Sequence, residues 1–585
     1  MVTYADRFWT KSYDPHVPGT LAPYPDVPLH HFLKKAAKET PNQIALVTST
    51  RLPSMLGKLG RMDTRITYAE LDRMSDALAA AFVDMGLQKG DRVGLVMPNI
   101  AAYVISFWAV LKAGGAIAAI NPTYPPEKIK FMLADSDAKL VVTMSMFYEN
   151  VKKTQAETGV KNIVVTNVKE YLPGLPKVLF TLTREKKDGH YVESLPDSDF
   201  WLQDLLGKYQ GQSPSVDVTG EDLGVFQYTG GTTGDPKAAM SKHGAMVANA
   251  LQCEIYLKGT TTDSFLGAIP MFHVFGMLSV LAFATILKTP IYLVPNARDI
   301  DDVLDNINTY RPTMFMGVPA LYNAIRLRDE VRNGEINLGS IRACISGSAP
   351  LAPATKTDFE KLTGGRLMEG YGMSETPTAT FVNPLEGENR TGSIGLPLPD
   401  VDVRIVSLDD GETDMPVGEP GELVIHAPQM MIGYHKMPTE TENTLREQGG
   451  KKWLFTGDIA RMDDEGYVYI VDRKKDMALI GGFNVYPNAV EKVILQHPTV
   501  AEVGVAAIPH PKKEGQEALK AWVVFKDGQS ATEDELVAHQ EEHLAGYEVT
   551  RRFAFVDDLP KTTVGKTLRR ELVRMETESA VTGEA

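Results

Sequence analysis

The stretch YTGGTTGDPK, residues 228–237, is dense in glycine and threonine and ends on Lys237. Small residues let backbone N–H groups converge on phosphate oxygens, while threonine hydroxyls and a lysine add further donors. A P-loop NTPase requires glycine directly before the lysine and a hydroxyl residue directly after it. Here Pro236 precedes the lysine and Ala238 follows it. The stretch therefore predicts a phosphate-binding loop outside the P-loop NTPase fold, although turns between ordinary strands have a similar composition.

The bulk composition is that of a globular chain with several domains. The chain has 585 residues, of which 43% are hydrophobic and 23% charged, and its net charge is −15. Such a balance provides no electrostatic footprint for nucleic acid, so we expect no nucleic-acid partner. Cys253 and Cys344 lie far apart, without metal-ligand spacing. This excludes a zinc cluster or a disulfide framework and fits a reducing compartment.

Neither the N-terminus nor the most apolar run indicates a membrane-inserted segment. The first 25 residues contain no apolar region of the kind found in secretory signals. The run VFGMLSVLAFATIL, residues 274–287, is shorter than the roughly 20 residues needed to cross a bilayer, so it predicts a buried helix. We expect a cytoplasmic protein.

From residue 66 onward, helical and strand-like patterns alternate. The segment 67–86 predicts a capped amphipathic helix, and 91–98 predicts a buried strand. An apolar helix is expected over 101–115 and a further strand over 116–122. This alternation favours largely parallel sheets with helices on both faces. The expected fold class is therefore α/β, with several domains.

The pattern changes near the C-terminus, where residues 466–487 show two strand-like runs around a charged turn. Further helices and strands follow, which together indicate a compact α+β module of about 110 residues. We place its boundary within residues 472–475, so the two expected domains span 1–471 and 472–585.

Residues 171–215 interrupt the α/β alternation because they mix apolar and basic side chains. Such a segment can rest on an anionic bilayer surface. The alternative is a packed helix followed by a solvated charged loop, and this is the interpretation that we favour.

Two further segments carry residue types that suit nucleotide chemistry. In RACISGSAPL, residues 342–351, a strand runs into a turn whose exposed backbone can approach a flat ring, although an ordinary strand-end turn looks the same. In GRLMEGYGMSET, residues 365–376, Tyr371 can stack on a purine and Glu375 can ligate Mg²⁺ on phosphates. The alternatives are a core aromatic ring and a carboxylate at a helix start.

The last two segments lie toward the C-terminus. In WLFTGDIARMDDEGYVYIVDRKKD, residues 453–476, Asp458 can accept two hydroxyl hydrogen bonds from a ribose and Arg473 can donate to the same sugar. A surface turn with a salt bridge is the alternative. In LPKTTVGKTLRREL, residues 559–572, Lys566 follows a glycine that lets it reach another domain, although a lysine in such a place is usually solvated.

Taken in this order, the segments closely resemble the acyl-adenylate-forming superfamily of acyl-CoA synthetases, peptide-synthetase adenylation domains and luciferases. Within it, the long-chain fatty acid–CoA ligases are most similar, through QYTGGTTGDPK, IPMFHVFG, YGMSET, FTGDIA and DRKKDMALIGGFNVYP. The resemblance extends from about Leu29 to Arg570. It implies a large N-terminal domain of αβ sheets with a small β-barrel-like subdomain, and a small mobile α+β lid domain at the C-terminus.

The resemblance also implies a reaction in two halves. A fatty carboxylate attacks the α-phosphorus of ATP to give acyl-AMP and pyrophosphate, and the thiol of coenzyme A then displaces AMP. ATP, Mg²⁺ and coenzyme A are therefore the expected cofactors. Carried over residue by residue, the family roles make Lys566, His273 and Glu375 catalytic, and make Thr229 and Glu375 the magnesium ligands.

The resemblance assigns the other site residues to binding. The residues expected to contact the nucleotide are Thr229, Gly230, Gly231, Thr232, Thr233, Gly234, Lys237, Gly347, Ser348, Ala349, Glu369, Gly370, Tyr371, Gly372, Met373, Ser374, Asp458, Ile470 and Arg473. Lys475 is the expected hinge of the lid, and Gly481, Gly482 and Phe483 are expected to line the coenzyme A channel. The acyl pocket is expected to be formed by Phe272, Met277, Gly317 and Val318. Because Gly317 has no side chain, it would leave the pocket open to a long acyl chain.

Three departures from the family pattern concern Ala238, Ala489 and the Glu548–Thr550 region. The first removes no functional group, and the others weaken any detailed expectation about lid contacts and coenzyme A affinity. A medium-chain or aryl acid–CoA ligase and a fatty acyl-AMP ligase stay open as alternatives. A non-enzymatic nucleotide-binding or uptake scaffold is disfavoured because the reactive groups are all present. Peripheral contact with the inner face of the membrane and a homodimer are also left open.

Overall fold

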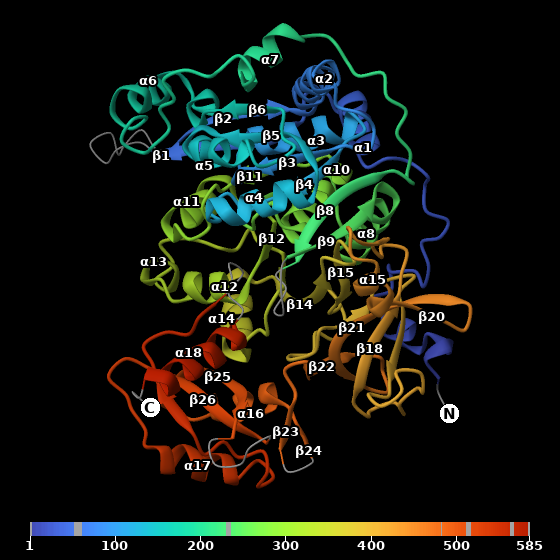
Figure 1. Ribbon diagram of the computed structural model, residues 1–585, viewed down its shortest axis with the longest axis vertical. Helices are drawn as coiled ribbons and strands as arrows, with labels where there is room; N and C mark the ends of the chain where they lie inside the picture. Colours follow the sequence, from blue (N-terminus) through green and yellow to red (C-terminus); the bar gives the residue numbers. More distant parts are fainter. Residues whose placement is uncertain are drawn as a thin grey trace. The chain divides into compact units, whose positions relative to one another are not determined.

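The computed structural model describes residues 3–51, 61–229, 236–480, 483–510, 516–561 and 567–582. The chain divides into two compact units (Figure 1). The large unit comprises Thr10–Val401 and Ala427–Asn443, and the small unit comprises Met1–Trp9, Asp402–His426 and Thr444–Ala585. The boundary that we place within residues 472–475 falls inside the small unit, and it stays a prediction.

The first sheet of the large unit has eight strands, and its central strands are parallel. Their order is β19-β9-β8-β4-β3-β5-β6-β7, in which only β8–β9 and β9–β19 pair antiparallel. The strands are β3 Arg92–Val96, β4 Ala116–Ala119, β5 Ala138–Met144, β6 Asn162–Thr166, β7 Phe200–Trp201, β8 Leu223–Thr229, β9 Lys237–Lys242 and β19 Gly433–Tyr434. The strands expected at 91–98 and 116–122 are confirmed as β3 and β4.

The second sheet of the large unit has nine strands and carries most of the candidate site. Its order is β16-β15-β14-β13-β12-β10-β11-β1-β2, with a parallel core from β14 to β1 and antiparallel strands at both edges. The strands are β1 Ile44–Arg51, β2 Arg61–Thr67, β10 Phe265–Gly267, β11 Ile291–Leu293, β12 Met314–Gly317, β13 Ala343–Ser346, β14 Arg366–Met373, β15 Thr378–Val382 and β16 Leu396–Pro397.

The helices of the large unit follow the sequence patterns closely. They are α1 His30–Glu39, α2 Tyr68–Asp84, α3 Ala101–Lys112, α4 Pro126–Asp135, α5 Ser145–Gln155, α6 Gly174–Thr183, α7 Leu202–Lys208, α8 His243–Tyr256, α9 Val274–Gly276, α10 Phe283–Leu287, α11 Ile300–Tyr310, α12 Pro319–Arg326, α13 Asp329–Arg332, α14 Pro353–Thr363 and α15 Pro438–Thr444. Helix α2 begins at a capping box in which Thr67 and Glu70 bond each other's backbone N–H groups, as the sequence predicts.

Helix α3 is apolar on all sides and is buried at every position. A helix of this kind is stable only inside a core, because no face of it suits water. Its one charged residue, Lys112, is fully buried and pairs with Asp72 at 2.5 Å and Asp76 at 2.8 Å, both from α2. The ion pairs compensate for the removal of the ammonium group from water.

The apolar run 274–287 forms a continuous buried helix, as predicted, but with an unexpected geometry. Between α9 and α10 the residues Met277–Ala282 adopt π-helical turns. Such turns are rare and occur often beside functional sites. None of the helices in the described part of the chain combines the length and apolar composition needed to span a bilayer.

The segment 171–215 contains a helix, α6. From the sequence we favour a packed helix here, but α6 is mostly exposed. Only Pro176 of its ten residues is buried. The rest of the segment holds β7, the edge strand of the eight-stranded sheet beside β6, and α7, which contacts β6 and α2.

The small unit is built from antiparallel strands and a C-terminal α+β module. A five-stranded sheet has the order β17-β18-β21-β20, with β22 added beside β21. Its strands are β17 Asp402–Val406, β18 Gly421–His426, β20 Leu445–Gln448, β21 Lys451–Met462 and β22 Val468–Arg473. The C-terminal module contains β23 Ala478–Ile480, β24 Phe483–Val485, β25 Val500–Pro509, β26 Glu517–Phe525, β27 Phe553–Phe555, α16 Pro487–Ile494, α17 Glu533–Glu541 and α18 Arg569–Thr582. The predicted α/β class, with several sheets and a smaller C-terminal module, is confirmed.

Candidate active site

A narrow pocket lies at the carboxyl ends of the parallel strands β13 and β14 in the large unit. The register places Gly317 of β12 opposite Ser346 of β13, and Ser346 opposite Glu369 of β14. Ligands of open parallel sheets bind beyond this edge of the strands. The pocket holds about 50 Å³ and is lined by His273, Val274, Phe275, Ser279, Ile345, Gly347, Ser348, Gly370, Tyr371, Gly372, Met373, Thr378, Ala379 and Val382. Segments that are far apart in the sequence therefore meet here.

Two residues of the pocket have backbone conformations that side-chain-bearing residues seldom adopt. Ser348 has φ +72°, and Thr378 has φ +134°. For a β-branched residue such as Thr378 a positive φ is costly, and such strain gathers at ligand sites. Ser348 is exposed, so its turn presents backbone groups to the pocket, and Ala349 beside it is partly exposed.

His273 lines the pocket and is the N-cap residue of α9. Its Nδ1 accepts a hydrogen bond from the backbone N–H of Phe275 at 3.2 Å. A neutral imidazole that accepts at Nδ1 carries its proton on Nε2, so the ring has a fixed tautomer with one free N–H direction. Burial lowers the pKa of His273 to about 4, which keeps the ring neutral near pH 7.

Strand β14 brings Gly370, Tyr371, Gly372 and Met373 to the pocket wall. The ring of Tyr371 packs edge-on against Phe381 at a centroid distance of 5.8 Å, and one side of it lines the pocket. A Cβ at Gly372 would collide with the carbonyl oxygen of Thr378. Gly372 is therefore needed for the close pairing of β14 with β15, and its expected contact with the nucleotide stays a prediction.

Glu369, expected at the nucleotide, is buried and holds backbone in place. One carboxylate oxygen accepts from the N–H of Leu351 at 3.1 Å and the other from the N–H of Gly392 at 2.9 Å. These bonds anchor the turn after β13 and a loop beyond β15. The side chain of Glu369 thus shapes the site through other residues.

Glu375 is buried and connects to Lys237 through an aromatic ring that the sequence analysis missed. The hydroxyl of Tyr434 in β19 donates to Oε1 of Glu375 at 2.6 Å. The ammonium group of Lys237 lies 5.5 Å from the centroid of the same ring and pairs with Glu440 of α15. Tyr434 follows a glycine in MMIGYHK, and no pattern in that stretch marked it as part of a site.

The candidate magnesium ligands fit a site in which the protein supplies only one or two of the metal's ligands. Among the residues that the structure describes, no group of three or more His, Cys, Asp or Glu side chains could hold a metal ion. Mg²⁺ in nucleotide enzymes is bound by one or two side-chain oxygens together with phosphates and water. Glu375, a buried carboxylate that accepts from the Tyr434 hydroxyl, suits that arrangement, and Ser374 next to it is also buried.

Thr229 and Lys237 are the described ends of the glycine-rich loop. They face each other at the end of the β8–β9 hairpin. Gly230, Gly231, Thr232, Thr233 and Gly234 lie outside the described residues, as do Gly481, Gly482 and Lys566. The roles expected for these residues therefore stay predictions.

The expected acyl pocket is mostly buried. Met277 is completely buried in the π-helical turns, and Phe272 and Val318 are partly exposed. A Cβ at Gly317 would lie 3.0 Å from Cζ of Tyr322. The Tyr322 hydroxyl in turn donates to the carbonyl oxygens of Phe315 at 2.8 Å and Ile345 at 3.0 Å. A fixed ring therefore fills the space beside Gly317, and its role in chain length stays a prediction.

In the small unit, Asp458 and Arg473 lie directly opposite each other on β21 and β22. The Nε of Arg473 is 3.1 Å from Oδ1 of Asp458, whose side chain is only 6% exposed. The pair therefore belongs to a largely buried strand pairing, in contrast to the surface turn considered as the alternative. Ile470, on the same strand as Arg473, is partly exposed.

Lys475 and Phe483, the described residues among those expected at the hinge and the coenzyme A channel, are both exposed. Lys475 is exposed two residues beyond β22. Phe483 is 55% exposed, and its ring stacks on Tyr547 with centroids 4.5 Å apart and planes 15° apart. An exposed aromatic pair of this kind offers a flat apolar surface to a ligand.

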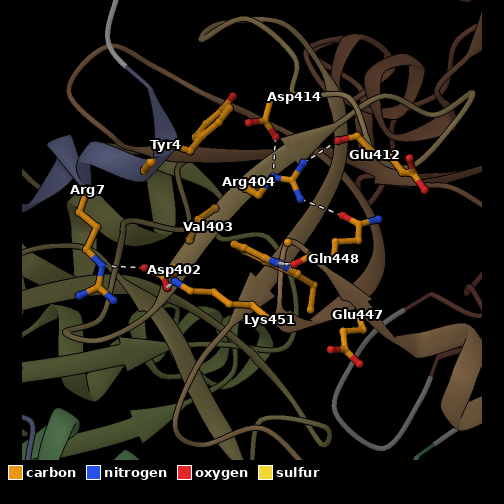
Figure 2. Close-up of a pocket in the computed structure, with 13 residues that line it drawn as sticks. Tyr4, Arg7, Asp402, Val403, Arg404, Glu412, Asp414, Glu447, Gln448 and Lys451 are labelled. Carbon is orange, nitrogen blue, oxygen red and sulfur yellow. Dashed lines mark hydrogen bonds and ion pairs between the residues drawn. The ribbon is translucent and has the colours of Figure 1, made fainter.

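A second cavity of about 720 Å³, also in the small unit, was not expected from the sequence. Figure 2 shows Arg404 between Asp414, the backbone of Glu412 and Gln448, with Asp402 paired to Arg7 at 2.6 Å and to Lys451 at 2.8 Å. The guanidinium of Arg404 also lies over the ring of Trp453. These charges satisfy one another, so the cavity wall is a structural network that joins the N-terminal residues to β17, β20 and β21.

The large unit, with its pocket at the carboxyl ends of parallel strands, has the architecture of a known class of enzyme. The chain belongs to the AMP-binding enzyme family, whose model matches residues 33–435, and a model for the C-terminal domain of AMP-binding enzymes matches residues 489–566. The resemblance inferred from the motifs is thereby confirmed.

Individual relatives are similar over nearly the whole chain. A long-chain-fatty-acid–CoA ligase of Bacillus subtilis is 36% identical over 579 residues, covering 98% of each chain. A long-chain-fatty-acid–CoA ligase of Escherichia coli O6:H1 is 37% identical over 518 residues, covering 87% of this chain and 89% of the relative. The crystal structure of ATP-bound MatB from Rhodopseudomonas palustris superposes with a TM-score of 0.80 at 27% identity, covering 94% of this chain and 99% of that one.

Proposed function

We propose that the protein is an ATP-dependent long-chain fatty acid–CoA ligase. An oxygen of the fatty carboxylate attacks the α-phosphorus of ATP, the bond to the β-phosphate breaks, and acyl-AMP and pyrophosphate form. The sulfur of coenzyme A then attacks the acyl carbonyl, and AMP leaves. The observation that carries this proposal is the identity of 36% to a long-chain-fatty-acid–CoA ligase over 98% of both chains.

The pocket of the large unit would bind the base and position the acid. The Tyr371 ring would stack on the adenine, and the backbone of Gly347 and Ser348 would border it. The Nε2–H of His273 would donate to the fatty carboxylate, a task that suits a neutral ring with a fixed tautomer. Because the ring stays neutral near pH 7, it would orient the carboxylate and leave the charge on the nucleophile undiminished.

The glycine-rich loop and Lys237 would hold the departing pyrophosphate. Lys237 now pairs with Glu440, and phosphate oxygens would compete for the same ammonium group. Mg²⁺ bound by Glu375 and Thr229 would neutralise charge that develops on the phosphates. Tyr434 would keep the Glu375 carboxylate in the orientation that ligation needs.

The small unit would supply the remaining contacts. Asp458 would accept hydrogen bonds from the ribose hydroxyls while Arg473 holds its carboxylate in place. Lys475 would serve as the hinge, and Phe483, with the loop before it, would contact the pantetheine arm. Lys566 would bring a positive charge to the reacting oxygens, which is the contribution that phosphoryl and adenylyl transfer require most.

A pyrophosphate-exchange assay across acids from acetate to oleate tests the proposal. We expect exchange that is strongest with C12–C18 acids, AMP as the nucleotide product, and a thioester detected by mass once coenzyme A is added. The Lys566→Met variant should lose most of the exchange while retaining nucleotide binding. Release of ADP, or exchange without any fatty acid dependence, would refute the assignment.

The same panel separates the alternatives. A preference for short or aromatic acids would identify a medium-chain or aryl acid–CoA ligase, and adenylate without thioester would identify an acyl-AMP ligase. ATP binding without pyrophosphate from any acid would identify a non-enzymatic scaffold. We further propose that the protein makes peripheral contact with the inner face of the membrane. A homodimer stays a prediction, and analytical sedimentation would measure the oligomeric state.

A further inference from the structure

We propose that α6 and the turn that follows it form a docking surface for an anionic lipid bilayer. This docking surface is defined here as the residues Leu175, Val178, Leu182, Lys186, Lys187 and Tyr191. The docking surface specifies which residues would make the membrane contact proposed above. The evidence for it does not depend on the ligase chemistry. In Figure 1, α6 lies at the outer margin of the eight-stranded sheet.

The apolar side chains of α6 point to solvent along one face. Leu175, Val178 and Leu182 are 52%, 54% and 76% exposed. Their spacing of three and four residues puts them on a single side of the helix. Scattered exposed leucines are common on protein surfaces, but an aligned stripe on an otherwise unburied helix is the pattern of an interfacial helix.

The stripe is held outward by contacts on the opposite side. The ring of Phe180 packs edge-on against His190 at 5.4 Å, and His190 Nδ1 lies 3.1 Å from the hydroxyl of Ser145 in α5. Glu185 is buried and pairs with Lys169 at 2.6 Å. These contacts fix α6 and its return turn to the large unit, so the exposure of the stripe is a feature of the folded segment.

The charges around the stripe complement an anionic surface. Residues 168–191 contain five basic and three acidic side chains, in a chain whose net charge is −15. The three carboxylates are already paired, Glu170 with Lys177, Glu185 with Lys169, and Asp188 with Arg184.

Two ammonium groups therefore remain to interact with lipid phosphates. Lys186 and Lys187 form no ion pair with any residue that the structure describes. Lys186 lies 4.4 Å from the ring centroid of Tyr191, which is itself 50% exposed. A lysine and a tyrosine beside an apolar stripe match the headgroup layer, where long amphipathic side chains lie with their polar ends in water.

The dimensions favour a bilayer over a protein partner. Specific protein interfaces bury on the order of 1,000 Å² or more, well beyond what three side chains on a ten-residue helix contribute. An interfacial helix needs only to insert a few apolar side chains at the acyl boundary, with cationic residues adding attraction to anionic lipid. A second copy of the chain is therefore the less favoured occupant.

Vesicle flotation of the full chain tests the docking surface. We expect binding to vesicles of 70% zwitterionic and 30% anionic lipid, and a loss of at least about tenfold in the Val178→Gln/Leu182→Gln variant. In the Lys186→Ser/Lys187→Ser variant, binding to anionic vesicles should be reduced. The binding that remains should have lost most of its dependence on salt concentration. Leu327→Gln, at a site 45% exposed elsewhere in the large unit, is the matched control and should bind as the unchanged chain does.

Three results would overturn the proposal. The first is that the unchanged chain does not float with the vesicles. The second is that both double variants float as well as the unchanged chain. The third is that Val178→Gln/Leu182→Gln converts a dimer to a monomer while vesicle binding persists. The last result would assign the surface to a second copy. Ligation of octanoate in solution, measured on the same samples, separates this proposal from the proposed function, because it should be unchanged in every variant that folds.

Discussion

The hydroxyl of Tyr434 lies 2.6 Å from Oε1 of Glu375, and the ring of the same tyrosine lies 5.5 Å from the ammonium group of Lys237. One side chain thus touches the candidate magnesium ligand and the lysine of the glycine-rich loop. A phenolic O–H that donates to a carboxylate fixes its orientation while leaving it ionised.

We expect Tyr434→Phe to raise the magnesium concentration needed for half-maximal pyrophosphate exchange by about tenfold, because a hydrogen bond to a charged group contributes about 1.5–3 kcal/mol. The ring remains, so the Lys237 contact and the thermal unfolding midpoint should change little. Tyr310→Phe, which removes a hydroxyl bonded to Asp63 far from the pocket, is the control. An unchanged magnesium dependence would show that Tyr434 does not position the metal ligand.

Asp458→Asn should reduce the preference for ATP over 2′-deoxy-ATP. An ionised carboxylate accepts from ribose hydroxyls, whereas the amide is a weaker acceptor and also loses the 3.1 Å pair with Arg473. We expect the ratio of kcat/KM values for the two nucleotides to fall about tenfold, as the loss of one charge-assisted hydrogen bond predicts. In Asp463→Asn, a change in the turn between β21 and β22, the ratio should stay as it is.

Arg569→Gln should destabilise the small unit by about 3–5 kcal/mol, the usual effect of removing one partner from a buried ion pair. Arg569 begins α18 and lies 2.8 Å from Glu491 and 3.2 Å from Asp476, and burial raises the pKa of Glu491. Thermal and urea unfolding measure the loss. The neighbouring Arg570→Gln, at an exposed position, should stay within about 0.5 kcal/mol of the unchanged chain. Equal effects of the two changes would contradict a special role for Arg569.

Gly317→Ala separates packing from chain-length selection. The new methyl group would press on the Tyr322 ring at 3.0 Å, and that ring is held by two hydrogen bonds. We expect a loss of about 1–3 kcal/mol in the free energy of unfolding. If Gly317 also borders the acyl chain, exchange with palmitate should fall more than exchange with octanoate. An equal fall for both acids would leave Gly317 a packing residue only.

Stability should decrease as the pH falls from about 6.5 toward 4. Burial lowers the pKa of His30 to about 3 and that of His243 to about 4, so below pH 6.5 the unfolded chain binds protons that the folded chain does not. The unfolding midpoint should therefore depend less steeply on pH in His30→Gln/His243→Gln, provided the double variant folds at pH 7.5. His31→Gln, at an exposed site, should keep the original slope.

Local sequence patterns determined much of the secondary structure. The capping box at Thr67 and Glu70 marked the start of α2, and the uniformly apolar 101–115 marked a buried helix, because both signals depend only on neighbours along the chain. The glycine-rich stretch with its lysine and the YGMSET motif likewise marked residues that the structure places at the β8–β9 hairpin and at the pocket.

Only the tertiary structure revealed how distant residues combine. Tyr434 and Glu375 are 59 positions apart, and the hydrogen bond between them depends on the antiparallel placement of β19 beside β9. The use of the Glu369 carboxylate for two backbone N–H groups, the Tyr322 ring beside Gly317 and the outward stripe of α6 are equally invisible to a reading along the chain. The physical reason is that propensity and capping act over a few residues, whereas burial and side-chain partnership are set by packing between segments that the sequence separates.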